Sequence, residues 1–178
     1  MSSLNLKGLA RLVIVAGLSV GLSACFRPLY GPTASGETLQ TVLSSIEVPE
    51  LKWPDAQARV GHYIRSEVIY ALNGSGQDLP KRYVLALSLS QTLQSPIVDT
   101  VTGRAQTATI AGTLTYTLTA KDGSKTVTTA TVTSYTTYER FPQRFATVRA
   151  ARDAEIRLAK ALADQVKTRL AMELATAS

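Results

Sequence analysis

The sequence predicts one α+β domain built as a two-layer sandwich, with a mostly antiparallel four-stranded sheet and two helices on one of its faces. Three observations predict this fold class. Apolar and polar residues alternate along residues 83–90 and 107–119, as they do in half-buried strands. The second of these segments is followed by the hairpin signal Lys121-Asp122-Gly123-Ser124. Residues 144–173 contain no Gly or Pro and carry apolar side chains at helical spacing.

The first two elements of the predicted domain are a strand over residues 39–48, which Pro49 ends, and a helix after it. Trp53-Pro54-Asp55 is typical of a helix start, because Pro fits the first turn and an acid there suits the helix dipole. Asn73-Gly74 favours the end of the same helix. Its apolar side chains repeat at helical spacing: Val60, Ile64, Val68 and Leu72.

Three further strands and their connections complete the predicted sheet. The strand at residues 83–90 precedes a predicted loop over residues 94–104, which contains Pro96, Asp99 and Gly103. The strand at residues 107–119 has one apolar face and one threonine face, and its antiparallel partner is predicted over residues 126–138. The order β-α-β-β-β-α then favours two layers, with both helices on the apolar face. The threonine face is either a contact surface or an ordinary polar surface.

The last predicted helix, over residues 144–173, has one apolar stripe and one charged side. Opposite charges four residues apart support it, at Asp153/Arg157 and Lys160/Asp164. The sequence predicts that the apolar stripe is core, and it consists of Ile156, Ala159, Ala163, Val166 and Leu170.

The N-terminus has the features of a bacterial lipoprotein signal. Lys7 and Arg11 precede an apolar stretch at residues 12–22, which is shorter than the roughly 20 residues that span a bilayer. Leu22-Ser23-Ala24-Cys25 fits the lipobox at every position. We therefore expect residues 1–24 to be removed and Cys25 to become the lipid-modified first residue of the mature protein.

The mature chain is expected to have a tether and one domain. Residues 25–38 are the lipidated cysteine and a flexible tether, and residues 39–175 are the single α+β domain. Cys25 is the only cysteine, so the sequence predicts no internal disulfide and a fold held by packing alone. Phe26 stands where enterobacterial lipoproteins retained in the inner membrane have Asp, so we expect passage to the outer membrane.

Charge and motifs argue against several classes of function. Without Lys7 and Arg11, the chain has 17 basic and 13 acidic residues, which suits acidic head groups or phosphates but not nucleic acid. No phosphate-binding loop, Cys/His zinc cluster or nucleophile motif is present, and His62 is the only histidine. The sequence predicts a non-enzyme without a cofactor or metal.

Both ends of the predicted mature chain resemble the LPS-assembly lipoprotein family LptE. The N-terminal resemblance lies in Cys25-Phe26-Arg27-Pro28-Leu29-Tyr30-Gly31. The C-terminal resemblance lies in Tyr135, Phe145-Ala146, Arg152-Asp153-Ala154-Glu155, Ala159, Leu162-Ala163, Val166 and Leu170. The expected order of elements also agrees with that family's two helices on one side of a four-stranded sheet. The resemblance implies an outer-membrane lipoprotein that plugs the LptD β-barrel, helps it assemble and helps deliver lipopolysaccharide to the outer leaflet.

The expected partners are therefore an LptD-like barrel, lipopolysaccharide and, through the lipid anchor, a membrane. Because lipid phosphates need charged donors, and strand ends and loops are common binding positions, we selected four candidate ligand-binding residues. They are Lys121, Lys125, Arg104 and Arg82, and no family motif supports them.

Two other functions remain compatible with the sequence. One is an auxiliary lipoprotein of an ABC-type lipid transport system, which would purify with an inner-membrane ATPase complex. The other is a periplasmic hydrolase that uses His62, whose ester-cleaving activity would be lost in His62→Ala.

Overall fold

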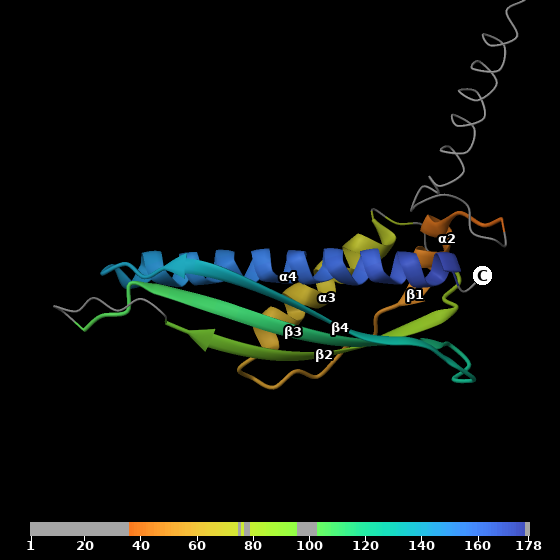
Figure 1. Cartoon of the computed structure of the whole chain (residues 1–178), viewed down its shortest axis with the longest axis horizontal. Helices are drawn as coiled ribbons and strands as arrows, with labels where there is room; N and C mark the ends of the chain where they lie inside the picture. Colours follow the sequence, from red (N-terminus) through yellow and green to blue (C-terminus); the bar gives the residue numbers. More distant parts are fainter. Residues whose placement is uncertain (1–35, 75, 77–78, 96–102, 177–178) are drawn as a thin grey trace, which may run out of the picture. The chain divides into compact units, whose positions relative to one another are not determined.

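The computed structural model describes residues 36–74, 76, 79–95 and 103–176. The predicted signal, Cys25, most of the predicted tether, and Pro96 and Asp99 of the predicted loop lie outside the described residues. The elements run, in chain order, α2 (Leu39–Ser44), β1 (Ile46–Glu47), α3 (Ala58–Asn73), β2 (Tyr83–Gln94), β3 (Thr107–Ala120), β4 (Thr126–Glu139) and α4 (Arg144–Thr176) (Figure 1).

The four strands form one sheet in the order β1-β2-β3-β4, with the helices on one face (Figure 1). The sheet is mixed: β1 runs parallel to β2, whereas β2, β3 and β4 pair antiparallel. The prediction of a mostly antiparallel sheet is corrected here. Helix α3 carries the chain back between β1 and β2, and a crossover of that kind connects parallel strands.

The predicted strand at residues 39–48 is wrong over most of its length, because residues 39–44 form helix α2. The Thr38 hydroxyl accepts a hydrogen bond from the Thr41 N–H at 3.3 Å and caps the helix start. Leu39, Val42 and Leu43 then share one buried helical face. The observed order is therefore α-β-α-β-β-β-α, with three helices where two were predicted.

Helix α3 begins at Ala58, later than Trp53-Pro54-Asp55 indicated. Those residues form a turn in which the Gln57 N–H donates to the Pro54 carbonyl at 2.8 Å. The Trp53 ring lies flat on α3 at Gly61, where an added Cβ would stand 2.5 Å from the ring. The predicted end is confirmed, since the helix stops at Asn73 and Gly74 takes a φ of 62°.

The long strands and their hairpin are confirmed. Along β3, buried side chains alternate with half-buried threonines, as the sequence pattern indicates. The turn between β3 and β4 is held by Asp122, whose carboxylate accepts the hydroxyl and the N–H of Ser124 at 2.7 and 3.0 Å. These hydrogen bonds lower the pKa of Asp122, with the Ser124 hydroxyl making the largest contribution.

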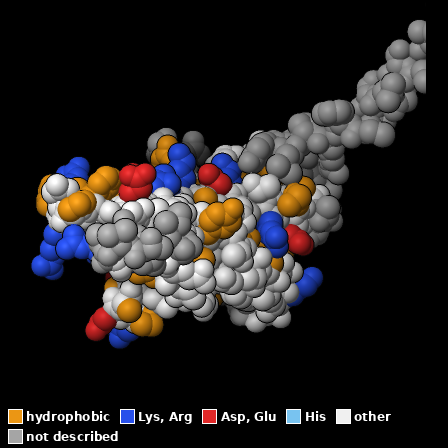
Figure 2. Space-filling model, turned by 60° about the vertical axis from the view of Figure 1, so that its left-hand side comes forward, with side chains coloured by type: hydrophobic (Ala, Val, Ile, Leu, Met, Phe, Trp, Pro, Cys, Tyr) orange, Lys and Arg blue, Asp and Glu red, His pale blue; other side chains and the backbone are white. Residues whose placement is uncertain are grey.

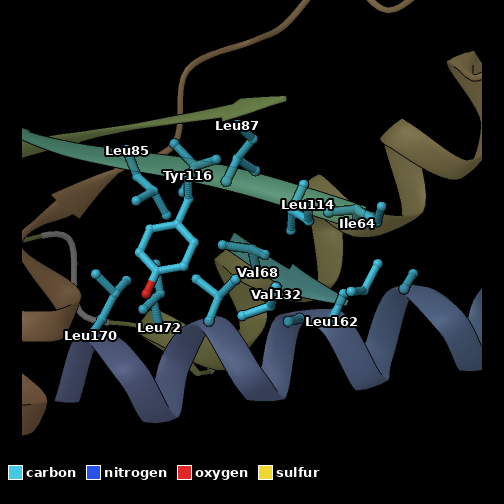
Figure 3. Close-up of a cluster of buried hydrophobic side chains, with 14 of the residues drawn as sticks. Ile64, Val68, Leu72, Leu85, Leu87, Leu114, Tyr116, Val132, Leu162 and Leu170 are labelled. Carbon is cyan, nitrogen blue, oxygen red and sulfur yellow. The ribbon is translucent and has the colours of Figure 1, made fainter. Parts of the chain in front are cut away.

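Helix α4 packs across the sheet at Gly112, in the middle of β3. A Cβ at Gly112 would lie 3.1 Å from Leu158 and 3.2 Å from Leu162, so the missing side chain allows the helix to approach closely. Figure 3 shows Leu162 and Leu170 of α4 directed toward Leu114 and Tyr116 of β3. This contact joins the two layers of the sandwich.

The predicted core stripe of α4 is correct at four positions and wrong at Ile156. Ala159, Ala163, Val166 and Leu170 are buried, but the Ile156 side chain is 40% exposed. Ile156 lies at the edge of the buried side, about 20° round the helix from the buried Ala163, where it lines a hollow with Glu67 and Tyr70 of α3. The residues that complete the buried side are Ala154, Leu158, Leu162, Ala171 and Leu174.

An ion pair joins α3 to α4. Glu155 is 5% exposed, and its two carboxylate oxygens accept hydrogen bonds from Nε and Nη2 of Arg59, each at 2.6 Å. The hydrogen bond to Glu155 raises the pKa of Arg59. Among the described residues, no helix is long and apolar enough to cross a membrane.

The observed position of Ile156 reverses one expectation drawn from the helical stripe. We expect Ile156→Asp to melt close to wild type, because its carboxylate stays in water. Leu158→Asp is the matched control and should fail to fold, since it buries a charge without a partner. Leu158→Ala should lower the free energy of unfolding by about 2–5 kcal/mol. Thermal melts of the three variants test this, and a failure of Ile156→Asp to fold would contradict the structure.

Tyr116 supplies a prediction about pH. Its side chain is 1% exposed, its hydroxyl has no hydrogen-bond partner among the described residues, and burial raises its pKa above the usual value of 10.0. Above that pH the unfolded chain ionises this tyrosine before the folded protein does, so wild type loses stability as the pH rises. Tyr116→Phe lacks this loss.

Urea unfolding of wild type and Tyr116→Phe from pH 8 to pH 11 measures the effect. We expect Tyr116→Phe to be at least as stable as wild type at pH 8, because it removes a buried polar group without a partner. Its advantage should grow above about pH 10, where the unfolded tyrosine ionises. If the free energies of unfolding of the two proteins run parallel from pH 8 to pH 11, Tyr116 has the same pKa in the folded and the unfolded chain, which would contradict the prediction.

Candidate functional site

The face of the sheet opposite the helices is a surface of hydroxyl groups. Pairing of β2, β3 and β4 aligns Ser90, Thr113 and Thr133 in one row across the three strands, and the row on one side of it consists of Ser88, Thr115 and Thr131. The row on the other side ends in Tyr135, whose side chain is 74% exposed. Several hydroxyls bond sideways to one another, as between Thr109 and Thr137 at 3.0 Å. This face, predicted from the alternation in β3, is therefore polar, and most of its side chains carry hydroxyl groups and no charge.

A second surface lies where β3 begins and where β4 passes into α4. We call it the arginine tip, and it consists of Arg104, Gln106, Arg140, Phe141, Arg144, Phe145, Val148 and Arg149. A hollow runs between the strand ends and the first turns of α4, lined by most of these residues and by Glu139. Figure 2 shows basic and hydrophobic side chains gathered at one end of the molecule.

Local hydrogen bonds fix the backbone of the arginine tip. The Arg140 N–H donates to the Gln106 carbonyl at 2.8 Å and closes the end of the sheet. The Thr147 hydroxyl accepts from the Phe141 N–H at 2.8 Å and donates to the Phe141 carbonyl at 3.0 Å. Thr147 therefore holds the turn that Pro142 begins after β4, and this turn places Phe141 beside the start of α4.

The tip combines positive charge with exposed apolar surface. Phe141, Phe145 and Val148 are 43%, 74% and 52% exposed. The Arg149 guanidinium lies over the Phe145 ring, 5.9 Å from its centre. The cluster contains four arginines and one acidic residue, Glu139. The N-terminus of α4 adds the positive end of the helix dipole. Such a surface suits a ligand with both anionic groups and hydrocarbon.

The four candidate ligand-binding residues do not form one site. Arg104 lies in the arginine tip. Arg82 and Lys121 lie at the other end of the sheet, where the Lys121 N–H donates to the Arg82 carbonyl at 2.8 Å, and Lys125 is exposed on the nearby hairpin. Arg82 forms an ion pair with Glu37 at 2.8 Å, and Lys121 forms one with Glu47 at 3.2 Å. Arg104 and Lys121 therefore lie at opposite ends of β3, as the antiparallel arrangement of the strands requires.

Most of the arginine tip was not predicted from the sequence. Its signal was the segment Arg140-Phe141-Pro142-Gln143-Arg144-Phe145, in which two aromatic residues and two arginines flank a proline between a strand and a helix. Arg104 is distant in the sequence from this segment, and only the pairing of β3 with β4 brings it to the same end of the sheet.

The structure gives His62 no catalytic surroundings within the described part of the chain. His62 is exposed on α3, and its ring is tilted against that of Tyr63, with 6.1 Å between the ring centres. No group of three metal-binding side chains occurs among the described residues either.

Comparisons with known proteins found one matching family model and several similar solved structures. The family described as "LptE: Lipopolysaccharide-assembly" matches residues 43–170. A solved structure described as a lipoprotein from Caulobacter crescentus CB15 has a TM-score of 0.62 and 23% identity, over 78% of this chain and 96% of that one. A minor lipoprotein from Acinetobacter baumannii has a TM-score of 0.39 and 15% identity, over 70% and 91%. Rare lipoprotein B from Shewanella oneidensis has a TM-score of 0.37 and 13% identity, over 72% and 96%. None of the curated proteins matches this sequence.

Proposed function

Because the chain belongs to the LptE family of lipopolysaccharide-assembly proteins, we propose that it plugs an LptD-like β-barrel and helps deliver lipopolysaccharide to the outer leaflet. The observation that carries this proposal is the family match over residues 43–170, which runs from α2 to α4 and includes every strand. The protein acts by binding and assembly, without catalysis or a cofactor.

The proposed anchor is the lipid on Cys25. The lipobox at residues 22–25, after a short apolar stretch with basic residues before it, supports this assignment. Residues 1–24 are then the signal, and residues 25–38 connect the lipid to the domain at 39–175. Several acyl chains on one residue anchor a protein stably, and the expected site is the periplasmic side of the outer membrane or the barrel lumen.

The proposed barrel contact uses the polar surfaces of the sandwich. The lumen of an outer-membrane barrel is polar and hydrated. The hydroxyl face of the sheet has neutral donors and acceptors, and α4 has exposed charges such as Arg157, paired with Asp153 at 2.8 Å. The polar groups of both surfaces can form hydrogen bonds with water or with polar side chains of a barrel, as a plug requires.

The proposed lipopolysaccharide contact is the arginine tip. Guanidinium groups bind phosphate oxygens by paired, charge-assisted hydrogen bonds. Exposed Phe141, Phe145 and Val148 lie beside these arginines and offer apolar contact for acyl chains. Arg104 keeps its proposed role here. Arg82 and Lys121 already pair with acids at the other end, so they and Lys125 serve as the comparison.

Binding of purified lipopolysaccharide to matched double variants tests the tip. We expect Arg140→Ala/Arg144→Ala to weaken binding at least tenfold, because each lost charged hydrogen bond is worth about 1.5–3 kcal/mol. Lys121→Ala/Lys125→Ala removes the same charge from the hairpin and should cause only a small loss that salt screens. Titrations at low and high salt distinguish a specific site from a general effect of surface charge. Equal, slight losses for both pairs would contradict a site at the tip.

Depletion tests the proposed function in the cell. Loss of the protein should lower the amount of correctly assembled barrel and of lipopolysaccharide at the surface. Wild type should restore both, and Cys25→Ala should fractionate away from outer membranes and restore neither fully. Normal surface lipopolysaccharide after complete depletion would overturn the proposal.

A further inference from the structure

Helix α4 extends past the start of α3 at the end of the molecule where β2 finishes (Figure 1). Arg59, in the first turn of α3, binds Glu155 of α4. Near the other end of α3, Gly74 and Lys167 line one hollow. The two helices therefore run side by side in the same direction from Glu155 onward. Residues 144–154, about 16 Å of helix, lie before the point where α3 begins.

The last leucine of β2 is exposed although it lies on the buried side of the strand. Leu85, Leu87 and Leu89 face the helices and are buried. Leu93 lies on the same side, because alternate residues of a strand share a face, yet its side chain is 55% exposed. The helix layer therefore covers β2 as far as Leu89 and leaves Leu93 open.

Val148 marks the same change from buried to exposed along α4. Seven residues make close to two helical turns, so Val148, Glu155 and Leu162 point in nearly the same direction. Glu155 and Leu162 are 5% and 0% exposed, whereas Val148 is 52% exposed. Val148 is thus directed like a core residue but belongs to the part of α4 that α3 does not reach.

Leu93 and Val148 belong to one uncovered end of the core. Leu93 pairs with Ile110 of β3. Val148 lines the hollow of the arginine tip together with Thr107, which comes three residues before Ile110 and about 10 Å from it along β3. We call the surface formed by Leu93 and Val148 the open shelf. It continues the hollow of the arginine tip across the helix side of the sheet.

Positive charge borders the open shelf. Arg144 and Arg152 come four residues before and after Val148, so they neighbour it on the surface of α4. Arg104 and Arg140 line the adjoining hollow. An occupant must therefore fit apolar side chains and guanidinium groups together. A lipid with phosphate groups and hydrocarbon chains has this combination.

We propose that the open shelf binds acyl chains of lipopolysaccharide while the phosphates of the same molecule bind the arginine tip. Hydrocarbon that lies on Leu93 and Val148 completes the core where α3 is absent, and it removes apolar surface of both partners from water. This inference rests on the proposed lipopolysaccharide contact and adds the residues that recognise its hydrocarbon. The protein then distinguishes an acylated lipid from its deacylated head group.

Binding of lipopolysaccharide and of its fully deacylated, still phosphorylated form separates the two parts of the site. Leu93→Ser/Val148→Ser should weaken binding of intact lipopolysaccharide by about tenfold or more, because two apolar contacts with hydrocarbon are lost. The same variant should bind the deacylated form as wild type does. Arg140→Ala/Arg144→Ala should weaken binding of both forms, since both carry the phosphates.

Two control variants accompany this comparison. Ile156→Ser makes the same kind of change at a partly exposed aliphatic residue of α4 outside the open shelf, and it should bind both forms as wild type does. Leu93→Met keeps an apolar side chain and should retain the affinity for intact lipopolysaccharide. Thermal melts of all these variants should stay close to that of wild type, because the replaced side chains are at least partly exposed.

A fluorescent label on the open shelf reports contact with hydrocarbon directly. Full-length Leu93→Cys protein that carries a polarity-sensitive dye should shift its emission to the blue with lipopolysaccharide and not with the deacylated form. Ile156→Cys with the same dye should show no shift, and wild type gives the background from Cys25. An anionic phospholipid in the same detergent should leave the emission at Leu93→Cys unchanged.

Three results would overturn the proposal. If Leu93→Ser/Val148→Ser binds intact lipopolysaccharide as tightly as wild type while Arg140→Ala/Arg144→Ala does not, the open shelf alone fails. If wild type binds neither form of lipopolysaccharide, the proposed lipopolysaccharide contact fails as well. An equal emission shift with the phospholipid would show that the open shelf does not select lipopolysaccharide.

Discussion

The close packing of helix α4 on strand β3 at Gly112 is the contact on which the rest of the structure depends. Leu158 and Leu162 lie against the backbone there, and burial of each leucine contributes about 1.5–3 kcal/mol. Once α4 is fixed on the sheet, Glu155 is in place to bind Arg59 and so to position α3. A side chain at Gly112 would separate the layers and disturb both contacts.

Covering the sheet on one face only has consequences for function. The uncovered face must be polar, and its rows of threonine and serine satisfy part of their hydrogen bonding among themselves. The start of α4 lies beyond the end of β4, which exposes Phe141 and Phe145 beside the four arginines of the arginine tip. The packing of α4 on the sheet thus determines the core, the hydroxyl face of the sheet and the arginine tip.

The sequence predicted the parts of the fold that local pattern determines. Three predicted features depend only on neighbouring residues, and the structure contains them. They are the alternation in β3, the Asp122-Gly123 turn and the helix end at Asn73-Gly74. Residues 39–44 allow a strand or a helix by pattern, and the Thr38 cap and burial against α3 and α4 decide for the helix. Ile156 was misplaced because it keeps the three- and four-residue spacing of the buried stripe, and only the tertiary packing decides that its position is partly exposed. The arginine tip joins Arg104 to Arg140 through strand pairing, which no local pattern reports.

We propose that this LptE-family protein works as the partner of an outer-membrane barrel. The most direct test is to purify the full lipoprotein from detergent-solubilised membranes and identify by mass spectrometry what comes with it. The account predicts a large LptD-like β-barrel in amounts comparable to the lipoprotein, in cells with intact lipopolysaccharide export. An inner-membrane ATPase complex in place of the barrel, or the lipoprotein without any barrel, would contradict it.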